Sequence, residues 1–274
     1  RRSSDLKGRT YKVCDDMAEM LLHTKLDVDV RMVKSPFSEI HIVLPENGII
    51  DVYNEETGYH PASSIYVNFH EVSDTEKMLR VLLTASPNEK SINEYDDALF
   101  YFRVPLHEGK VSESLEDCLV NWRSDPLNAK FATENDEGML PQAFHFVLNV
   151  LLYITSHEAD VVKQNPDEAE ALARRLGGLK NPTKKRKVEK RLSSLSRLPV
   201  YMVGKNIHLS SEERMAYQNS RGLGRHSIRY PVGGHWRMQW YGPKEESYQK
   251  QRWIKPHFRG PEFAELVKST GVIK

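Results

Sequence analysis

The chain has 274 residues, of which 39% are hydrophobic and 28% are charged, a composition that indicates a globular protein and excludes a disordered or fibrous one. Its two cysteines are too few for a disulfide framework, and no apolar stretch approaches the ~20 residues of a membrane helix, so we expect a cytoplasmic protein with no membrane partner. The net charge of +1 divides unevenly: residues 1–173 hold 16 Lys/Arg and 31 Asp/Glu (net −15), and residues 174–274 hold 23 and 7 (net +16).

This charge division predicts two surfaces with different partners, the basic one suited to phosphate backbones. The alternative is that the two parts attract each other within one fold. The chain begins at Arg1 rather than at a methionine, which we interpret as a trimmed or incomplete N-terminus.

The first predicted element is an amphipathic helix over residues 11–24, because Val13, Met17, Met20 and Leu21 recur at helical spacing. The pattern then changes to short β-branched and aromatic runs separated by turn residues. Five strands are predicted, over residues 39–44, 49–53, 64–72, 78–84 and 98–104. Strands at this spacing favour an α+β fold, a mostly antiparallel sheet with helices packed on one face.

Two further helices are predicted over residues 114–122 and 140–156. The second is apolar nearly all round, so we expect it to be the buried central helix, with Pro141 at its start and His145 as a hydrogen-bonded core imidazole. Together these elements form an acidic α+β body over residues 1–173, which we interpret as the part that recognises a peptide or other partner.

A polar helix over residues 166–176 is predicted to end at Gly177 and Gly178. Residues 174–197 are rich in Lys and Arg and predict a basic linker or a helical hairpin. Residues 198–274 predict a small, basic, β-rich C-terminal module, which begins with a strand over residues 198–203.

The most concentrated signal lies in this module, where three of the four tryptophans accompany many basic side chains. In a strand, Trp236, Met238 and Trp240 would project from one face, and His235, Arg237 and Gln239 from the other. Such a surface could stack bases and neutralise phosphates, or the tryptophans could be the core of the module. The candidate RNA- or partner-binding residues are Arg225, Arg229, His235, Trp236, Arg237, Trp240, Arg252, Trp253, Lys255 and Arg259.

His235 and Arg237 are also candidate catalytic residues, since a metal-independent ribonuclease needs an acid–base group and a cation for the phosphorane. Plain RNA binding requires the same residue types, so the pattern does not separate the two activities. The histidines lack companion cysteines or carboxylates at ligand spacing, so no metal is predicted. We find no phosphate-binding loop, nucleophile elbow or dinucleotide fingerprint, so no cofactor is predicted either.

The segment Gly234-His235-Trp236-Arg237-Met238-Gln239-Trp240-Tyr241-Gly242 resembles the C-terminal signature Gly-His-Trp-x-x-x-Trp-x-Gly of the "VA-two" type V-A anti-CRISPR family. The following Arg252-Trp253-Ile254-Lys255-Pro256 continues the likeness, which covers about 30 residues. Similar blocks occur in proteins of phages and other mobile elements.

The resemblance implies a regulator in a bacterial host cell that inhibits biogenesis of a CRISPR effector. It would bind the nascent polypeptide of its target through residues 1–173, engage mRNA or the ribosome through residues 174–274, and cause loss of the message. Two alternatives stay open: a toxin-like endoribonuclease acting through His235 and Arg237, and a DNA-binding protein of a mobile element.

Overall fold

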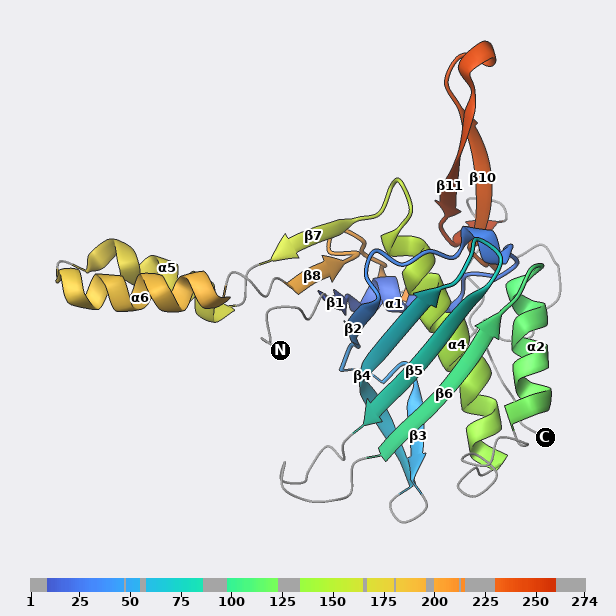
Figure 1. Ribbon diagram of the computed structural model, residues 1–274, viewed down its shortest axis with the longest axis horizontal. Helices are drawn as coiled ribbons and strands as arrows, with labels where there is room; N and C mark the ends of the chain where they lie inside the picture. Colours follow the sequence, from blue (N-terminus) through green and yellow to red (C-terminus); the bar gives the residue numbers. More distant parts are fainter. Residues whose placement is uncertain are drawn as a thin grey trace.

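One large sheet, the helices on one of its faces, and two projecting hairpins make up the protein in the computed structural model (Figure 1). The structure describes residues 9–46, 48–54, 58–85, 98–122, 134–164, 167–179, 181–195, 200–211, 213–214 and 230–259. No helix within these ranges is long and apolar enough to cross a membrane.

The main sheet has eight strands in the order β6-β5-β4-β2-β1-β8-β7, with β3 paired to β4. Pairing is antiparallel except where β1 lies parallel to β2 and to β8. The predicted mostly antiparallel α+β fold is therefore confirmed. The strands are β1 (Arg9–Val13), β2 (Glu39–Val43), β3 (Asp51–Asn54), β4 (Gly58–Glu71), β5 (Lys77–Ala85), β6 (Ala98–Leu106), β7 (Val161–Gln164) and β8 (Val200–Val203).

All five strands predicted in the body form, because their side chains alternate between a buried and an open face. In β4, Ile65 and Val67 are buried, whereas Tyr66 between them is 48% exposed. The buried side chains of the sheet join those of helices α1 (Asp15–Leu22), α2 (Val111–Trp122) and α4 (Glu134–Ile154) in one core. The opposite face of β4, β5 and β6 is turned toward the viewer in Figure 1.

Helix α4 is the central helix, as predicted, and Phe144, Phe146 and Leu148 within it have no exposed surface. Its start was predicted wrongly. The helix begins at Glu134, so Pro141 lies inside it rather than in its first turn.

Two strand placements also correct the sequence predictions. Residues 11–13 belong to β1, and the helix expected from Tyr11 begins at Asp15. The strand β8, expected to open the C-terminal module, pairs with β1 and β7 in the main sheet. Over so few residues, the apolar spacing near Tyr11 fits both a helix and a strand. The pairing of β1 with β8 joins segments about 190 residues apart, which no local sequence pattern can indicate.

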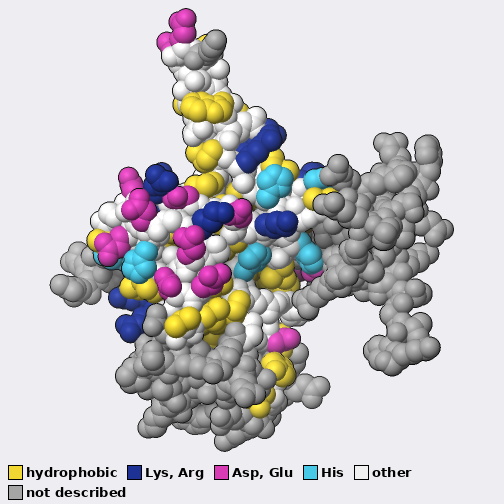
Figure 2. Space-filling model, turned by 90° about the vertical axis from the view of Figure 1, so that its right-hand side faces the viewer, with side chains coloured by type: hydrophobic (Ala, Val, Ile, Leu, Met, Phe, Trp, Pro, Cys, Tyr) yellow, Lys and Arg dark blue, Asp and Glu magenta, His cyan; other side chains and the backbone are white. Residues whose placement is uncertain are grey.

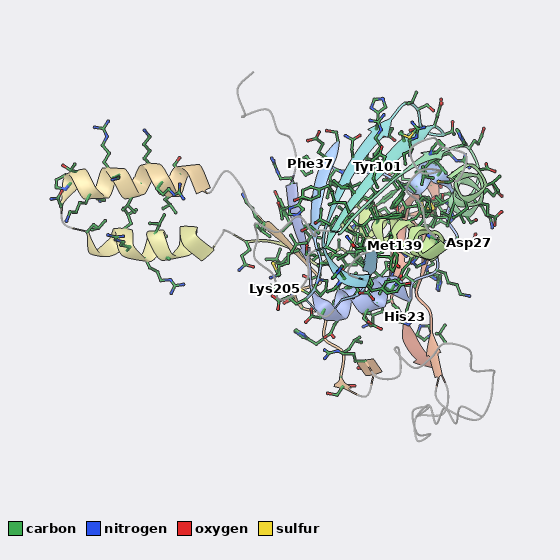
Figure 3. All side chains as sticks on the ribbon, turned by 90° about the horizontal axis from the view of Figure 1, so that it is seen from below. His23, Asp27, Phe37, Tyr101, Met139 and Lys205 are labelled. Carbon is green, nitrogen blue, oxygen red and sulfur yellow. The ribbon has the colours of Figure 1, made fainter. Side chains whose placement is uncertain are left out.

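Helices α5 (Asp167–Gly178) and α6 (Pro182–Leu195) form a helical hairpin between β7 and β8 that stands away from the sheet (Figures 1 and 3). Of the two structures predicted for the basic segment, the helical hairpin is the one observed. Gly177 and Gly178 are part of α5, and neither has the positive φ of a left-handed cap, so the predicted cap is wrong.

The C-terminal residues form two pairs of antiparallel strands. Strands β10 (His235–Tyr241) and β11 (Tyr248–Ile254) make a long hairpin, with the 3₁₀ turn η3 (Lys244–Glu246) in its connection. Strands β9 (Tyr230–Val232) and β12 (His257–Arg259) pair beside it. The hairpin projects from the body, with apolar side chains along it (Figure 2).

A buried lysine holds the segment between α1 and β2 against the sheet. The Lys77 ammonium donates hydrogen bonds to the carbonyls of Val30 (3.1 Å) and Val33 (2.6 Å), and it lies 3.2 Å from a Glu71 carboxylate oxygen. Lys77 is 1% exposed, so these partners replace the water that its charge would otherwise need.

Candidate functional site

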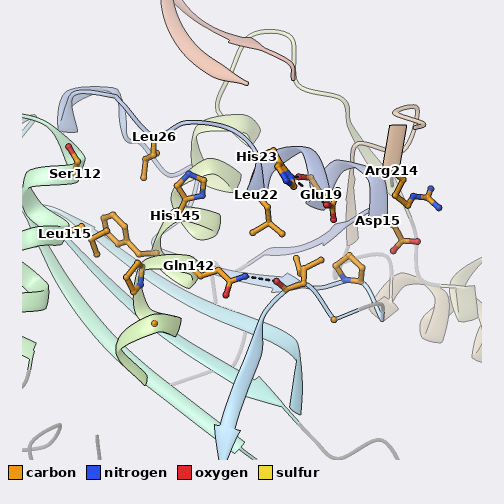
Figure 4. A pocket seen from close by; sticks show the side chains of 16 residues that line it. Asp15, Glu19, Leu22, His23, Leu26, Ser112, Leu115, Gln142, His145 and Arg214 are labelled. Atoms are coloured by element: carbon orange, nitrogen blue, oxygen red, sulfur yellow. Dashed lines mark hydrogen bonds and ion pairs between the residues drawn. The ribbon is translucent and has the colours of Figure 1, made fainter. Parts of the chain in front are cut away.

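A cleft of about 970 Å³ lies between α1, α2 and α4 (Figure 4). Helix α1 contributes Asp15 and Glu19, which are four residues apart and therefore share one helix face. Apolar lining residues come from all three helices, the loop after α1 and the loop before β3: Leu22, Leu26, Pro45, Ile49, Leu115, Pro141 and Phe144. Polar His23, Ser112, Gln142, His145 and Arg214 complete the lining with two glycines. The cleft thus combines an acidic wall with apolar surroundings.

Polar contacts fix several side chains around this cleft. Gln142 donates a hydrogen bond to the carbonyl of Ile49 at 3.1 Å, which ties α4 to the loop before β3. The His23 ring nitrogen Nδ1 lies 2.9 Å from the Glu19 carbonyl and 3.7 Å from a Glu19 carboxylate oxygen. Arg214 lines one end of the cleft, and its guanidinium Nε donates to the Asp16 carboxylate at 3.0 Å.

His145 lines the cleft and is partly buried, and its ring forms a hydrogen bond with the backbone of Thr24 and lies 3.4 Å from the Asn149 amide nitrogen, so the predicted hydrogen-bonded imidazole lies at the edge of the core. Burial lowers the pKa of His145 below the ordinary histidine value and outweighs the backbone hydrogen bond with Thr24, which raises it. A lowered pKa favours the neutral imidazole at pH 7. The negative charge of the Asp15 and Glu19 wall is therefore not offset by His145.

The β10–β11 hairpin contains most of the predicted binding residues. Its register places Trp236 opposite Trp253 and Arg237 opposite Arg252, and opposed residues project from the same face. The alternation predicted from the sequence is therefore confirmed: Trp236, Met238 and Trp240 share one face with Trp253, and His235 and Arg237 share the other with Arg252.

The tryptophan face is divided along its length. Trp236 is 6% exposed and belongs to the core, whereas Met238 is 42% and Trp240 is 63% exposed. Trp253 is partly buried and meets the Tyr153 ring edge-on, with centroids 5.1 Å apart. At the base of the hairpin the tryptophans fill the core, and toward its tip they are available for contacts.

A polar network fastens the base of the hairpin to the body. The side-chain oxygen of buried Asn149 accepts a hydrogen bond from the Trp236 indole at 2.8 Å, and its amide nitrogen donates to the carbonyls of Leu21 (3.2 Å) and Thr24 (3.0 Å). The Trp253 indole donates to the Thr24 hydroxyl at 3.1 Å. Both tryptophans are thus tied to the end of α1.

Gly234, the first residue of the family signature, is required by close packing at this junction. Its N–H donates to the His23 carbonyl at 3.1 Å, and its carbonyl accepts from the Lys25 N–H at 2.7 Å. A Cβ atom at Gly234 would lie 2.6 Å from the Thr24 hydroxyl oxygen and 3.0 Å from the Ile254 carbonyl oxygen. The backbone of the hairpin therefore approaches α1 too closely for a side chain.

The opposite face of the hairpin is polar and basic. His235 and Arg237 are exposed. Arg237 and Arg252 both donate to the side-chain oxygen of Gln239, at 2.7 and 3.1 Å, and Arg252 also lies 3.2 Å from a Glu158 carboxylate oxygen. These three basic residues form a cluster that can contact phosphate.

The other predicted binding residues have separate positions. Lys255 is exposed just after β11 and lines a cavity of about 640 Å³ with Trp253. Arg259 belongs to β12, and Arg225 and Arg229 lie outside the described residues. Among the residues that the structure describes, no three His, Cys, Asp or Glu side chains come together as a metal site would require.

Sequence reasoning missed the acidic cleft and the Asn149 network. The cleft depends on the approach of α1 to α4, which no local pattern specifies. The sequence did contain an indication of the role of Asn149, because it is a polar residue within an otherwise apolar stretch of α4. A buried amide needs hydrogen-bond partners, and one of them is the Trp236 indole.

Fold and site together define a mixed α/β protein with an acidic cleft and a C-terminal tryptophan hairpin docked beside it. The chain belongs to the Anti-CRISPR type V subtype A2 family, described as AcrVA2-like, whose model matches residues 11–258. The family likeness first seen in about 30 residues thus extends over nearly the whole chain. A crystal structure of AcrVA2 is similar with a TM-score of 0.44 and 12% identity, over 92% of this chain and 72% of that chain. The search of curated proteins found no match.

Proposed function

We propose that this anti-CRISPR family member represses production of its target protein by binding the nascent polypeptide in the cleft between α1 and α4. In the same proposal, the basic C-terminal part, residues 174–274, engages mRNA or the ribosome, and the message is then lost. One observation carries the proposal: the cleft pairs two carboxylates with apolar walls in about 970 Å³. This is near the upper end of usual ligand-pocket volumes, ~300–1,000 Å³, and has room for several peptide residues.

The chemistry of the cleft supports a basic, amphipathic segment as the bound peptide. Asp15 is exposed at the cleft wall and Glu19 is half-buried there, so both can meet Lys, Arg or a terminal amine. Leu115 and Ile49, which are only partly buried, offer apolar contacts in the same cleft. Apolar anchors supply affinity and the carboxylates select the charge of the peptide.

The test is a pull-down of stalled translation complexes that display the N-terminal segment of a type V-A effector. The double variant Asp15→Asn/Glu19→Gln keeps side-chain size and removes the negative charge from the wall, and should recover at least tenfold less complex. Glu116→Gln/Asp117→Asn on α2 is the matched control, because these exposed carboxylates lie outside the cleft. Equal recovery by both double variants would contradict peptide binding at the acidic wall.

The ribonuclease alternative is favoured by the exposed His235 and Arg237, which share a hairpin face with half-buried Arg252. Labelled mRNA incubated with the purified protein tests it directly. Cleavage that disappears in His235→Ala but persists in His257→Ala would establish the nuclease. Intact RNA in all samples would favour a binding protein.

A further inference from the structure

The helical hairpin of α5 and α6, residues 167–195, projects from the body (Figures 1 and 3), and apolar side chains pack between its two helices. The half-buried side chains recur at one-turn spacing, as Leu172, Leu176 and Leu179 on the α5 side and Val188 and Leu192 on α6. The Asn181 side chain caps α6 by accepting from the N–H groups of Thr183 (3.0 Å) and Lys184 (3.3 Å). We call residues 167–195 the basic arm.

Charge is distributed unevenly along the basic arm. Residues 171–188, its outer half, contain seven Lys or Arg and no Asp or Glu. Three carboxylates, Asp167, Glu168 and Glu170, lie instead at the start of α5, where the arm leaves the body. The attached end, residues 167–170 and 189–195, contains four Asp or Glu and two Lys or Arg in all, so the positive charge is concentrated at the free end.

The cations of the outer half also point in many directions. Lys184, Lys185, Arg186 and Lys187 are consecutive and all exposed, and at ~100° per residue they cover about 300° around α6. Figure 3 shows nitrogen-tipped side chains projecting from both sides of the helix pair. A flat partner would meet only part of this charge.

These features exclude several partners by their chemistry. A membrane-surface helix needs a continuous apolar face, but the apolar side chains of the basic arm pack between α5 and α6. Stacking on single-stranded bases needs aromatic rings, and residues 167–195 contain none. The DNA major groove admits a single α-helix, whereas the basic arm is a pair of helices, so a DNA duplex presents its phosphates mainly to one side of the arm. A folded RNA brings the phosphates of neighbouring helices together, so it can surround such an arm.

We propose that the outer half of the basic arm inserts among converging phosphates of a folded RNA and recognises its backbone and shape rather than its sequence. The inference rests on the RNA-contacting part of the proposed function and assigns that contact to α6 instead of to the tryptophan hairpin. Binding through several Lys and Arg side chains should weaken steeply with salt, by about 0.9 in the log–log slope for each double-helical phosphate neutralised.

The experiment measures fluorescence anisotropy of a labelled transfer RNA with the full chain between 50 and 200 mM KCl. The arm variant is Lys184→Gln/Lys185→Gln/Arg186→Gln/Lys187→Gln, in which glutamine keeps helix propensity. The control variant is Lys12→Gln/Lys34→Gln/Lys163→Gln/Lys205→Gln, which removes the same net charge from exposed positions on the body. We expect at least tenfold weaker binding and a slope smaller by about 3–4 in the arm variant alone.

Three results would overturn the inference. Equal weakening in the two variants would mean that only net charge matters. A DNA duplex that competes as well as unlabelled transfer RNA would remove the preference for folded RNA. A wild-type chain that binds no transfer RNA, yet still recovers stalled complexes in the pull-down, would overturn the arm contact while leaving peptide binding in place. Failure of the pull-down with RNA binding intact would instead support the arm and contradict the peptide proposal.

Discussion

Trp236 and Trp240 lie four residues apart on one strand face and are expected to respond very differently to truncation. Trp236 is 6% exposed and donates its indole N–H to Asn149 at 2.8 Å. Trp240 is 63% exposed. We therefore compare Trp236→Ala, Trp236→Phe and Trp240→Ala, so that one residue type is tested in two environments on the same hairpin.

The magnitudes follow from what each change leaves behind. Trp236→Ala removes a buried ring and creates a cavity, at a cost of about 3–5 kcal/mol of unfolding free energy. Trp236→Phe keeps most of the ring but leaves the buried Asn149 oxygen without its donor, which costs about 1–3 kcal/mol. Trp240→Ala removes an exposed ring and should stay within about 0.5 kcal/mol.

Thermal and urea unfolding of the three variants measure these costs. At about 2–4 °C per kcal/mol for a chain of roughly this size, Trp236→Ala should lower Tm by about 6–20 °C, and Trp240→Ala should leave it nearly unchanged. Comparable losses in Trp236→Ala and Trp240→Ala would refute the assignment of only the hairpin base to the core. An unchanged Tm in Trp236→Ala would refute the anchoring network itself.

Four further outcomes follow from the structure. Gly234→Ala should cost about 1–3 kcal/mol in urea unfolding because its Cβ would crowd α1, whereas Gly177→Ala, with open space in a helix, should stabilise by up to about 1 kcal/mol. Lys77→Met should cost about 1–3 kcal/mol in the same assay, because the carbonyls of buried Val30 and Val33 lose their donor, whereas the Glu71 carboxylate remains solvated. Burial lowers the pKa of His145 in the folded protein, so the unfolded chain binds the proton more readily. The stability should therefore fall as the pH drops below about 6.5. In melting experiments at several pH values, His145→Gln should reduce this dependence of Tm on pH. His235→Ala and Arg237→Ala should melt as the wild type does, and full repression in cells by both would exclude this hairpin face as the working surface.

The body of the fold could be predicted because its signals are local. Strands β4 and β5 alternate so regularly that one face had to be buried, and the apolar surface of α4 could only be satisfied at the centre. Strands β1 and β8 could not be placed in the same way. Each has at most five residues, and both depend on parallel pairing with distant segments.

The candidate site was predicted less completely, for a related reason. Alternation correctly assigned Trp236 and Trp240 to one face, but it contains no information on where the hairpin leaves the body. The exposed fraction of the side chain rises from 6% at Trp236 to 63% at Trp240, although the sequence alternates in the same way at both positions. The cleft walls Asp15 and Phe144 are separated by more than a hundred residues, so only the tertiary structure brings them together.

The position of the Gly-His-Trp segment changes how loss of activity in its variants should be interpreted. Trp236 and Gly234 contact α4 and the end of α1, and the same two helices supply the acidic and apolar walls of the cleft. A Trp236 variant that loses repression could therefore have lost the shape of the cleft rather than a contact with RNA. The exposed Arg237 and Trp240 do not share this ambiguity, because neither contributes to that junction. Contacts with a partner at the hairpin are best tested at these two residues, and the signature tryptophan is best understood as a structural connection between the hairpin and the cleft.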